Sequence, residues 1–196
     1  MEFEARFHQV IKKFDDENRH DPNQIVINGT PRPRELVYAE WLTDWVLQLR
    51  PDASEALLLA ARCQHICRWM IPRSSYPMTR AGYLRWREEL KHFHAQKSAE
   101  ILRQSGYPEE MIARVHALNL KKNLGQDEEC QVLEDALCLV TLQHQLGELM
   151  KKTEPEKMIT ILQKTWKKMS PAGREEALKL PFSDREKELV AKAGLG

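Results

Sequence analysis

Much that would mark a particular class of protein is scarce or missing in this sequence. Its 196 residues carry 30 Lys and Arg against 29 Asp and Glu, so the net charge is only +1. Such a balance gives no reason to expect nucleic acid or an anionic membrane as a partner, and any anion site must be local. A signal peptide and a long apolar run are also missing. We therefore expect a small anionic substrate, no membrane and no nucleic acid, and leave the oligomeric state open.

Cysteine is equally scarce. The four that are present lie in otherwise apolar segments of helical period, at Cys63, Cys67, Cys130 and Cys138. Cysteines in such surroundings predict a reduced, cytoplasmic protein rather than a disulfide-bonded secreted domain. A structural zinc site held by the four thiols is an alternative, although cysteines on helices are more often small buried hydrophobic residues.

Sustained alternation of apolar and polar residues, the mark of a β-strand, is missing too, whereas every long segment has apolar residues at helical spacing. Helices are expected over about 3–18, 34–49, 54–70, 79–105, 108–122 and 127–152, with two or three shorter ones after residue 154. A short extended piece at 24–27 lies in the turn-rich connection after the first helix. We predict a single-domain all-α helical bundle with a short helical appendage at about 154–193.

Residues that favour helix termini stand at several of these boundaries. Pro51 stops one helix, and Asp52 or Ser54 can cap the next. Thr79 stands where the long fourth helix begins, and Gly106 where it ends. These residues predict where the chain turns between helices.

Four polar motifs interrupt the apolar pattern. The apolar run from Leu57 to Ile66 predicts a buried helix, on which His65 would be surrounded by apolar side chains. A polar group in such surroundings needs a hydrogen-bond partner or a metal. The others are His92-Phe93-His94-Ala95, Lys121-Lys122 and Leu133-Glu134-Asp135-Ala136. A helical bundle could bring all four together, which suggests a buried site.

The order of these motifs resembles the HD superfamily of metal-dependent phosphohydrolases. There, one helix supplies a histidine, the next a His-Asp pair after a Leu-Ala-Ala run, and a late helix a distant Asp. In this chain Gln64 and His65 occupy the positions of the pair, His94 a later element, and Asp135 the last one. The resemblance covers about 33–145 and implies an HD-like core.

Three departures from the HD pattern are visible. Glu35 stands near the position of the first histidine, with Glu40 on the same helix as an alternative. Gln64 replaces the histidine of the pair, and Lys121-Lys122 stands where some members carry histidines. The chain resembles more closely a bacterial and fungal family, DUF4202, which is grouped as a domain of unknown function and described as HD-like. That likeness runs over nearly the whole chain and names no reaction.

The resemblance implies a metal site. Glu35, His65, His94 and Asp135 would supply two carboxylates and two imidazoles, a set that suits Mn, Fe, Co, Ni or Zn. Water bound to such an ion can act as a nucleophile near neutral pH. The alternative is that the two histidines satisfy buried hydrogen bonds and that Asp135 caps a local backbone.

Catalytic groups are expected beside the metal. Lys121 or Lys122 could stabilise charge on a phosphoryl oxygen, and Glu134 precedes the last ligand. The lysines could equally be a favourable helix end.

An arginine-rich loop is the expected anion site. Its candidate substrate-binding residues are Gln64, Arg68, Arg73, Ser75, Tyr76 and Arg80. Guanidinium groups bind phosphate or carboxylate through paired hydrogen bonds. The alternative is a solvated basic loop whose arginines stack on Trp69 and Trp86.

These features predict a metal-dependent phosphohydrolase that acts on a small phosphorylated metabolite or nucleotide. One alternative is a non-catalytic HD-like binding or regulatory module, which the loss of the His-Asp pair favours. Another is a di-iron oxygenase of HD type, which needs more histidines and carboxylates than the sequence places.

Overall fold

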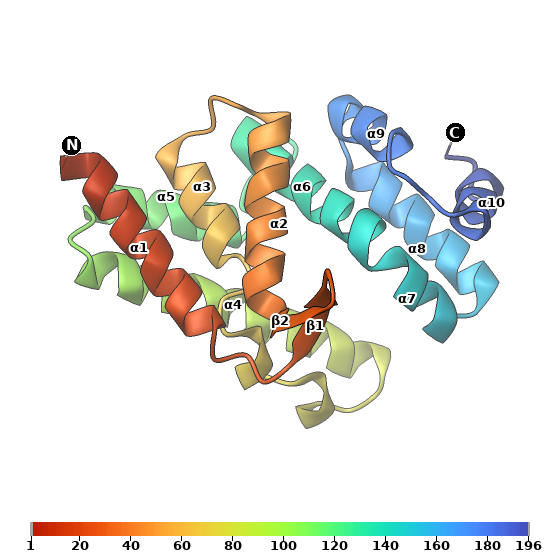
Figure 1. Cartoon of the computed structure of the whole chain (residues 1–196), viewed down its shortest axis with the longest axis horizontal. Coiled ribbons are helices and arrows are strands. Elements are labelled where there is room, and N and C mark those ends of the chain that lie inside the picture. Colours follow the sequence, from red (N-terminus) through yellow and green to blue (C-terminus); the bar gives the residue numbers. More distant parts are fainter. Residues whose placement is uncertain (1, 196) are drawn as a thin grey trace. The chain divides into compact units, whose positions relative to one another are not determined.

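The structure is a computed structural model that describes residues 2–195, with side chains from residue 4 onward. The chain is predominantly helical, which confirms the expected all-α fold (Figure 1). Within the described residues, no helix combines the length and apolarity that crossing a bilayer requires. The helices are α1 (Glu2–Asn18), α2 (Arg34–Leu49), α3 (Glu55–Cys63), α4 (Arg80–Gln104), α5 (Glu109–Asn119), α6 (Glu128–His144), α7 (Leu146–Lys152), α8 (Pro155–Lys168), α9 (Pro171–Leu178) and α10 (Asp184–Lys192).

Side-chain caps fix several helix starts where the sequence predicts them. The hydroxyl of Ser54 accepts the Leu57 N–H at the start of α3, and that of Thr79 accepts the Gly82 N–H at the start of α4. Each cap satisfies a backbone donor that the first helical turn leaves without a partner. Gly106, with φ +75°, ends α4.

The third helix is shorter than predicted, because α3 ends at Cys63 and not near Met70. The chain then turns, and Cys67 adopts a left-handed conformation with φ 53°. Its N–H donates to Oδ1 of Asn18, at the end of α1, over 3.1 Å. His65 therefore lies in a turn fixed from another helix, and not on a helix as expected.

The predicted helix over 127–152 is divided into α6 and α7 at Gln145. The fifth helix likewise ends at Asn119, and Lys121 and Asn123 have positive φ angles of 53° and 65°. Lys121 consequently lies in a turn rather than on a helix.

A two-stranded antiparallel hairpin precedes α2 and contains the extended piece expected at 24–27. Its strands are β1 (Gln24–Ile27) and β2 (Thr30–Pro33), paired from Gln24 with Pro33 to Ile27 with Thr30. Asn28 and Gly29 form the turn with φ angles of 50° and 80°, as a tight hairpin turn requires. The second strand, β2, leads directly into the first turn of α2.

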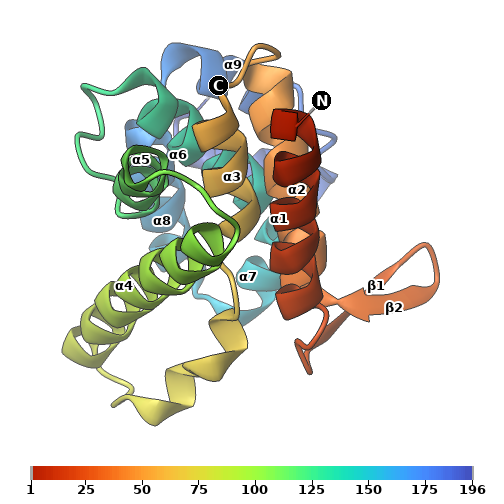
Figure 2. The same ribbon diagram turned by 90° about the vertical axis from the view of Figure 1, so that its left-hand side faces the viewer.

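The described chain groups into two compact units. Unit 1 comprises residues up to 44 together with 52–122, and unit 2 comprises 45–51 together with the residues from 123 on. In unit 1, α3 and α4 each pack against α1 and α5 (Figures 1 and 2). In unit 2, α6 packs against α7, α8 and α9, and α8 against α10. The sequence analysis distinguished only the helices after about residue 154, as an appendage to one domain. That single-domain organisation stays a prediction.

Each unit has its own core of large, fully buried apolar side chains. Those of unit 1 include Phe14, Leu57, Leu59, Leu102 and Leu118. Those of unit 2 include Leu133, Leu139, Leu146, Met158 and Leu162.

Candidate functional site

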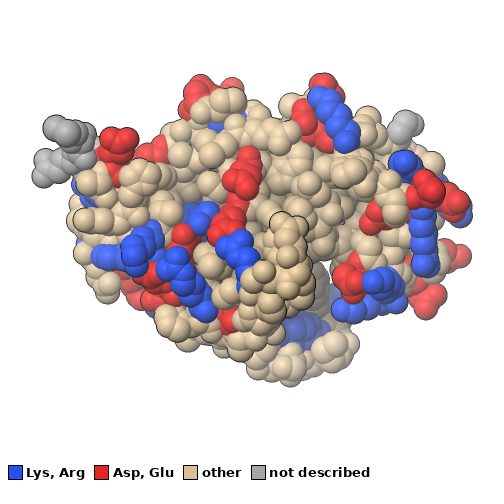
Figure 3. All heavy atoms as spheres, viewed as in Figure 1, with Lys and Arg blue, Asp and Glu red and all other residues tan. Residues whose placement is uncertain are grey.

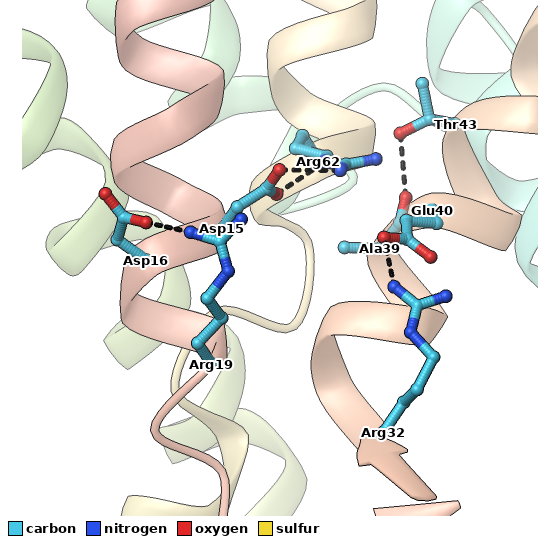
Figure 4. Close-up of polar contacts among 8 residues, drawn as sticks. All are labelled: Asp15, Asp16, Arg19, Arg32, Ala39, Glu40, Thr43 and Arg62. Carbon is cyan, nitrogen blue, oxygen red and sulfur yellow. Dashed lines mark hydrogen bonds and ion pairs between the residues drawn. The ribbon is translucent and has the colours of Figure 1, made fainter. Parts of the chain in front are cut away.

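The turn after α3 forms the centre of the candidate site in unit 1. Arg62, in the last turn of α3, binds Asp15 of α1 through two hydrogen bonds of 2.6 and 2.7 Å (Figure 4). Asn18, one helical turn further along α1, binds the backbone at Cys67. Helix α1 therefore fixes both sides of the turn that carries His65.

His94 projects from α4 to the same turn. Its Nδ1 donates to the carbonyl of Ile66 over 2.7 Å, so the neutral ring carries its proton on Nδ1. The Nε2 atom is then a bare acceptor, buried and without a hydrogen-bond partner. Burial lowers the pKa of His94 to about 4. The hydrogen bond to Ile66 opposes this change, and the positive charge of Arg68 adds to it. At neutral pH, His94 presents an uncharged imidazole with a free lone pair.

His65 lies beside His94, with their ring centroids 5.8 Å apart. Tyr38 of α2 lies on another side of His65, at 6.5 Å between centroids. Burial lowers the pKa of His65 well below its ordinary value, and Arg68, His94, Lys121 and Arg87 lower it further. The surroundings of His65 are therefore positively charged, and the ring is neutral at physiological pH.

Glu35 lies in the first turn of α2 and is 3 % exposed. The Asp21 carboxylate positions it by accepting the Glu35 N–H over 3.0 Å. Burial raises the pKa of Glu35 to about 7, although Arg68 and Arg34 oppose the change. Its Oε2 atom is buried without a hydrogen-bond partner, so this carboxyl has spare capacity for a ligand.

Arg68 connects these groups. Its guanidinium carbon lies 5.0 Å from the centroid of the Trp86 ring, as expected for cation–π stacking. It acts electrostatically on Glu35, His65 and His94. The structure thus brings together Glu35, His65, Arg68 and His94, with Lys121 near enough to His65 to affect its pKa.

Gln64 and Glu40, the other two candidates beside these groups, have different surroundings. Gln64 is buried, and its Nε2 donates weakly to the Asn119 carbonyl at 3.5 Å while its Oε1 has no partner. Glu40, the alternative to Glu35, instead accepts a 2.7 Å hydrogen bond from Arg32 of the hairpin (Figure 4). Glu35 is therefore the stronger of the two candidates on α2.

In the arginine-rich loop between α3 and α4, Arg73 binds backbone carbonyls of the loop itself. Arg73 donates to the carbonyls of Tyr76 and Pro77, at 2.9 and 2.8 Å, and more weakly to that of Thr79. Ser75 and Arg80 are exposed, and the Tyr76 hydroxyl has its pKa raised by a hydrogen bond to Glu89. Arg73 thus organises the loop, and anion binding by Arg73 and Arg80 stays a prediction.

Asp135 and Glu134 belong to α6 in unit 2. Asp135 is 3 % exposed and accepts hydrogen bonds from the N–H and hydroxyl of Ser170, at 2.9 and 2.5 Å, and from Gln131 at 3.0 Å. Glu134 pairs with Lys168 at 3.5 Å. Asp135 therefore caps backbone at the start of α9, which was the alternative to metal binding. Its sharing of a metal with the two histidines stays a prediction.

Among the residues described, no group of three or more His, Cys, Asp and Glu side chains could hold a metal ion. The four cysteines form no disulfide and are buried, and burial raises the pKa of Cys63 to about 11. Of the four residues predicted as ligands, His65 and His94 lie side by side in unit 1, and Lys122 is exposed to solvent.

The model of one protein family, described as a domain of unknown function (DUF4202), matches residues 8–190. The chain belongs to this family. Comparisons with curated proteins and with solved structures gave no match. The family match includes Glu35, His65, His94 and Asp135, but its description names no reaction. The resemblance to the HD superfamily stays a prediction.

Sequence reasoning missed three residues that shape the site, namely Asn18, Tyr38 and, for its positioning of Glu35, Asp21. Asp21 could have been found, because Asp-Pro-Asn before a helix is a turn signal. Tyr38 follows Glu35 by three residues and so shares its helix face. Asn18 carries no such signal, since its partner Cys67 is distant in sequence.

Proposed function

We propose that the chain is a phosphohydrolase that acts on a small phosphorylated metabolite or nucleotide, with a divalent ion held by His65 and His94. The observation that carries the proposal is the bare, buried Nε2 atom of His94 beside His65, within positively charged surroundings. The four reduced, buried cysteines support a cytoplasmic location for this activity.

The positive charges favour an anionic substrate. Arg68, Arg87 and Lys121 all act on His65, while both imidazoles are neutral. Glu35 is the acidic group of this set, and the raised pKa keeps much of it protonated near neutral pH. A phosphoryl group would therefore meet an excess of positive charge, which stabilises the negative charge that develops during phosphoryl transfer.

The two histidines fit a shared divalent ion. Metal–nitrogen distances are about 2.0–2.1 Å, which places two imidazole centroids on one ion on the order of 5–6 Å apart. The observed separation of 5.8 Å agrees with this, and the Nδ1 bond of His94 to Ile66 is the kind of contact that orients a metal-ligating histidine. Such an ion would supply hydroxide by lowering the pKa of its water. The role of Glu35 would be to ligate through Oε2 or to hold a proton.

The direct test is hydrolysis by metal-loaded protein of phosphate monoesters, diesters, nucleotides and sugar phosphates. His65→Ala should abolish both turnover and metal content. His92→Ala is the control, because His92 lies on α4 two residues before His94 but is exposed and pairs with Glu88. No turnover above that of His65→Ala, over the whole panel and with Mn, Fe, Co, Ni and Zn, would overturn the proposal.

A non-catalytic binding module is the second candidate. It is favoured by the commitment of Asp135 to the start of α9 and by the lack of a three-residue ligand group among the described residues. Titration calorimetry with inorganic phosphate separates the two. Phosphate binding that Arg68→Ala weakens by tenfold or more, without turnover, would assign the site to binding alone.

A further inference from the structure

A long stretch of unit 1 carries no acidic residue. From Ala56 to Arg87 the sequence has six arginines and neither Asp nor Glu. Two of these arginines have a structural role within unit 1, because Arg62 binds Asp15 and Arg73 binds loop carbonyls. The others extend along the loop after α3 and the first two turns of α4. A near-neutral chain thus concentrates positive charge in one segment.

Exposed apolar side chains accompany these arginines. Met78 is 82 % exposed, Met70 60 %, Leu84 56 % and Tyr83 41 %. Large apolar side chains that cluster on a surface usually mark a binding site, because leaving them in water costs free energy. Arg80, Arg85 and Arg87 are exposed on the same first turns of α4. We name these seven residues the arginine–methionine surface.

The loop that presents this surface is held in place. Arg73 donates to two consecutive loop carbonyls, and the indole of Trp86 donates to the Ile71 carbonyl over 2.8 Å. Gly82 packs directly on the Pro77 backbone, where a larger residue would not fit. In both ribbon views the loop projects outward beside the start of α4, and its tip at the lower edge is tan in Figure 3. The exposed methionines therefore lie on a loop that is held by these contacts and projects outward.

We propose that the arginine–methionine surface binds the anionic surface of a lipid bilayer. Arg80, Arg85 and Arg87 are attracted to anionic headgroups, because Glu88 and Glu89, which follow them on α4, are engaged by Lys91 and by the Tyr76 hydroxyl. Met78, Leu84 and Tyr83 can enter the boundary between headgroups and acyl chains. The cytoplasmic leaflet carries such lipids, which agrees with the compartment proposed above. Net charge gave no sign of this partner, because the acidic residues that balance the arginines lie elsewhere in the chain.

Lipid explains more of the surface than another anionic partner does. Nucleic acid would use the arginines and Tyr83, but it would gain little from exposed methionine and leucine side chains. An acidic peptide needs a groove or a strand edge for its backbone, whereas these exposed residues lie on a loop and helix start that project outward in both ribbon views. Protruding apolar residues among arginines suit a soft, anionic and apolar surface.

The test is co-sedimentation of the full chain with vesicles of phosphatidylcholine alone and of equal parts phosphatidylcholine and phosphatidylserine. Binding is expected to the mixed vesicles only, and to fall with added salt. Arg85→Glu should weaken it by at least about fivefold, the effect of one basic charge near such a surface. The double variant Met78→Asp/Leu84→Asp should abolish it.

Matched controls come from unit 2, where Leu124 is 39 % exposed and Arg185 is also exposed. Leu124→Asp and Arg185→Glu should bind as the unmodified chain does, and thermal melts verify that every variant is folded. Equal recovery on both kinds of vesicle, no recovery on either, or equal loss in the control variants would overturn the proposal. Binding to poly-glutamate without binding to vesicles would also overturn it, in favour of an acidic polypeptide.

Discussion

Glu35 is 3 % exposed and its carboxyl has one oxygen without a partner, so its protonation should affect stability. Burial raises its pKa from 4.5 to about 7. Between these values the unfolded chain releases the proton while the folded chain keeps it, so the free energy of unfolding falls as pH rises. The shift corresponds to about 3 kcal/mol of stability, which is fully present below pH 4.5 and is lost as pH rises to about 7.

We predict that Glu35→Gln removes this dependence, because the amide does not ionise. Urea unfolding of metal-free protein across this pH range checks the prediction. The variant should gain stability relative to the unmodified chain as pH rises through the window. Glu40→Gln is the control, since Glu40 is half-buried and paired with Arg32. Parallel pH profiles for Glu35→Gln and the unmodified chain would contradict the assignment.

Single residues were predictable from the sequence where their character depends on local pattern. Glu35, His94 and Asp135 are all buried polar residues, as apolar flanks indicated. Their partners were not predictable, because Ile66 and Ser170 lie 28 and 35 residues away from the side chains they bind. A histidine in an apolar segment predicts a polar partner without identifying it.

At the scale of elements, the turn after α3 depends on Asn18. The apolar pattern of 57–70 continues through the turn, so periodicity alone extends the helix to Met70. The helix ends earlier because Asn18 binds the Cys67 N–H while Cys67 adopts φ 53°. Helix starts at Ser54 and Thr79 were predictable, because those caps are local.

We predict that Asn18→Ala lowers the free energy of unfolding by about 1–3 kcal/mol, since it leaves the buried Cys67 N–H without an acceptor. It should also loosen the turn that carries His65. Hydrogen exchange at the Cys67 amide measures this locally, and protection should fall there more than in α8. Asn23→Ala provides the comparison, because Asn23 is exposed. Unchanged protection at Cys67 would show that Asn18 does not hold the turn.

Asp135 performs the corresponding role in unit 2, where it holds the start of α9 against α6. Its carboxylate accepts two hydrogen bonds from Ser170. Gly173 lies so close that a Cβ there would be 2.7 Å from the Asp135 carboxyl carbon. We predict that Asp135→Ala lowers the free energy of unfolding by about 2–4 kcal/mol, because buried hydrogen bonds to a charged group are lost. Denaturant unfolding of metal-free protein measures it.

The same variant separates the capping role of Asp135 from metal binding. Capping makes the loss equal with and without added metal, whereas a metal ligand would make it larger in metal-loaded protein. Asp184→Ala is the control, since Asp184 is at the start of α10 but fully exposed. A difference in stability that grows with metal concentration would restore Asp135 to the ligand set.

At the scale of the whole molecule, unit 2 is not continuous in sequence, which no local pattern predicts. It takes residues 45–51, the end of α2 and the turn after it, together with the helices from α6 on. Trp45 is 8 % exposed and its indole donates to Gln143 of α6 over 2.8 Å. Gln48 donates to Glu176 at 3.1 Å, and Arg50 pairs with Glu128 at 3.3 Å. These contacts complete the unit.

We therefore predict that a fragment beginning at Asn123 is much less stable than the same helices in the full chain. It would leave the apolar surface that Trp45 and Val46 cover exposed to water, and burial of large side chains is worth about 1.5–3 kcal/mol each. Thermal melts followed by far-ultraviolet circular dichroism should show a broad transition for the fragment, and a peptide spanning residues 34–51 should sharpen it. A peptide with Trp45→Ala should have little effect. A sharp transition of the fragment alone, at the temperature of the full chain, would show that residues 45–51 are dispensable to unit 2.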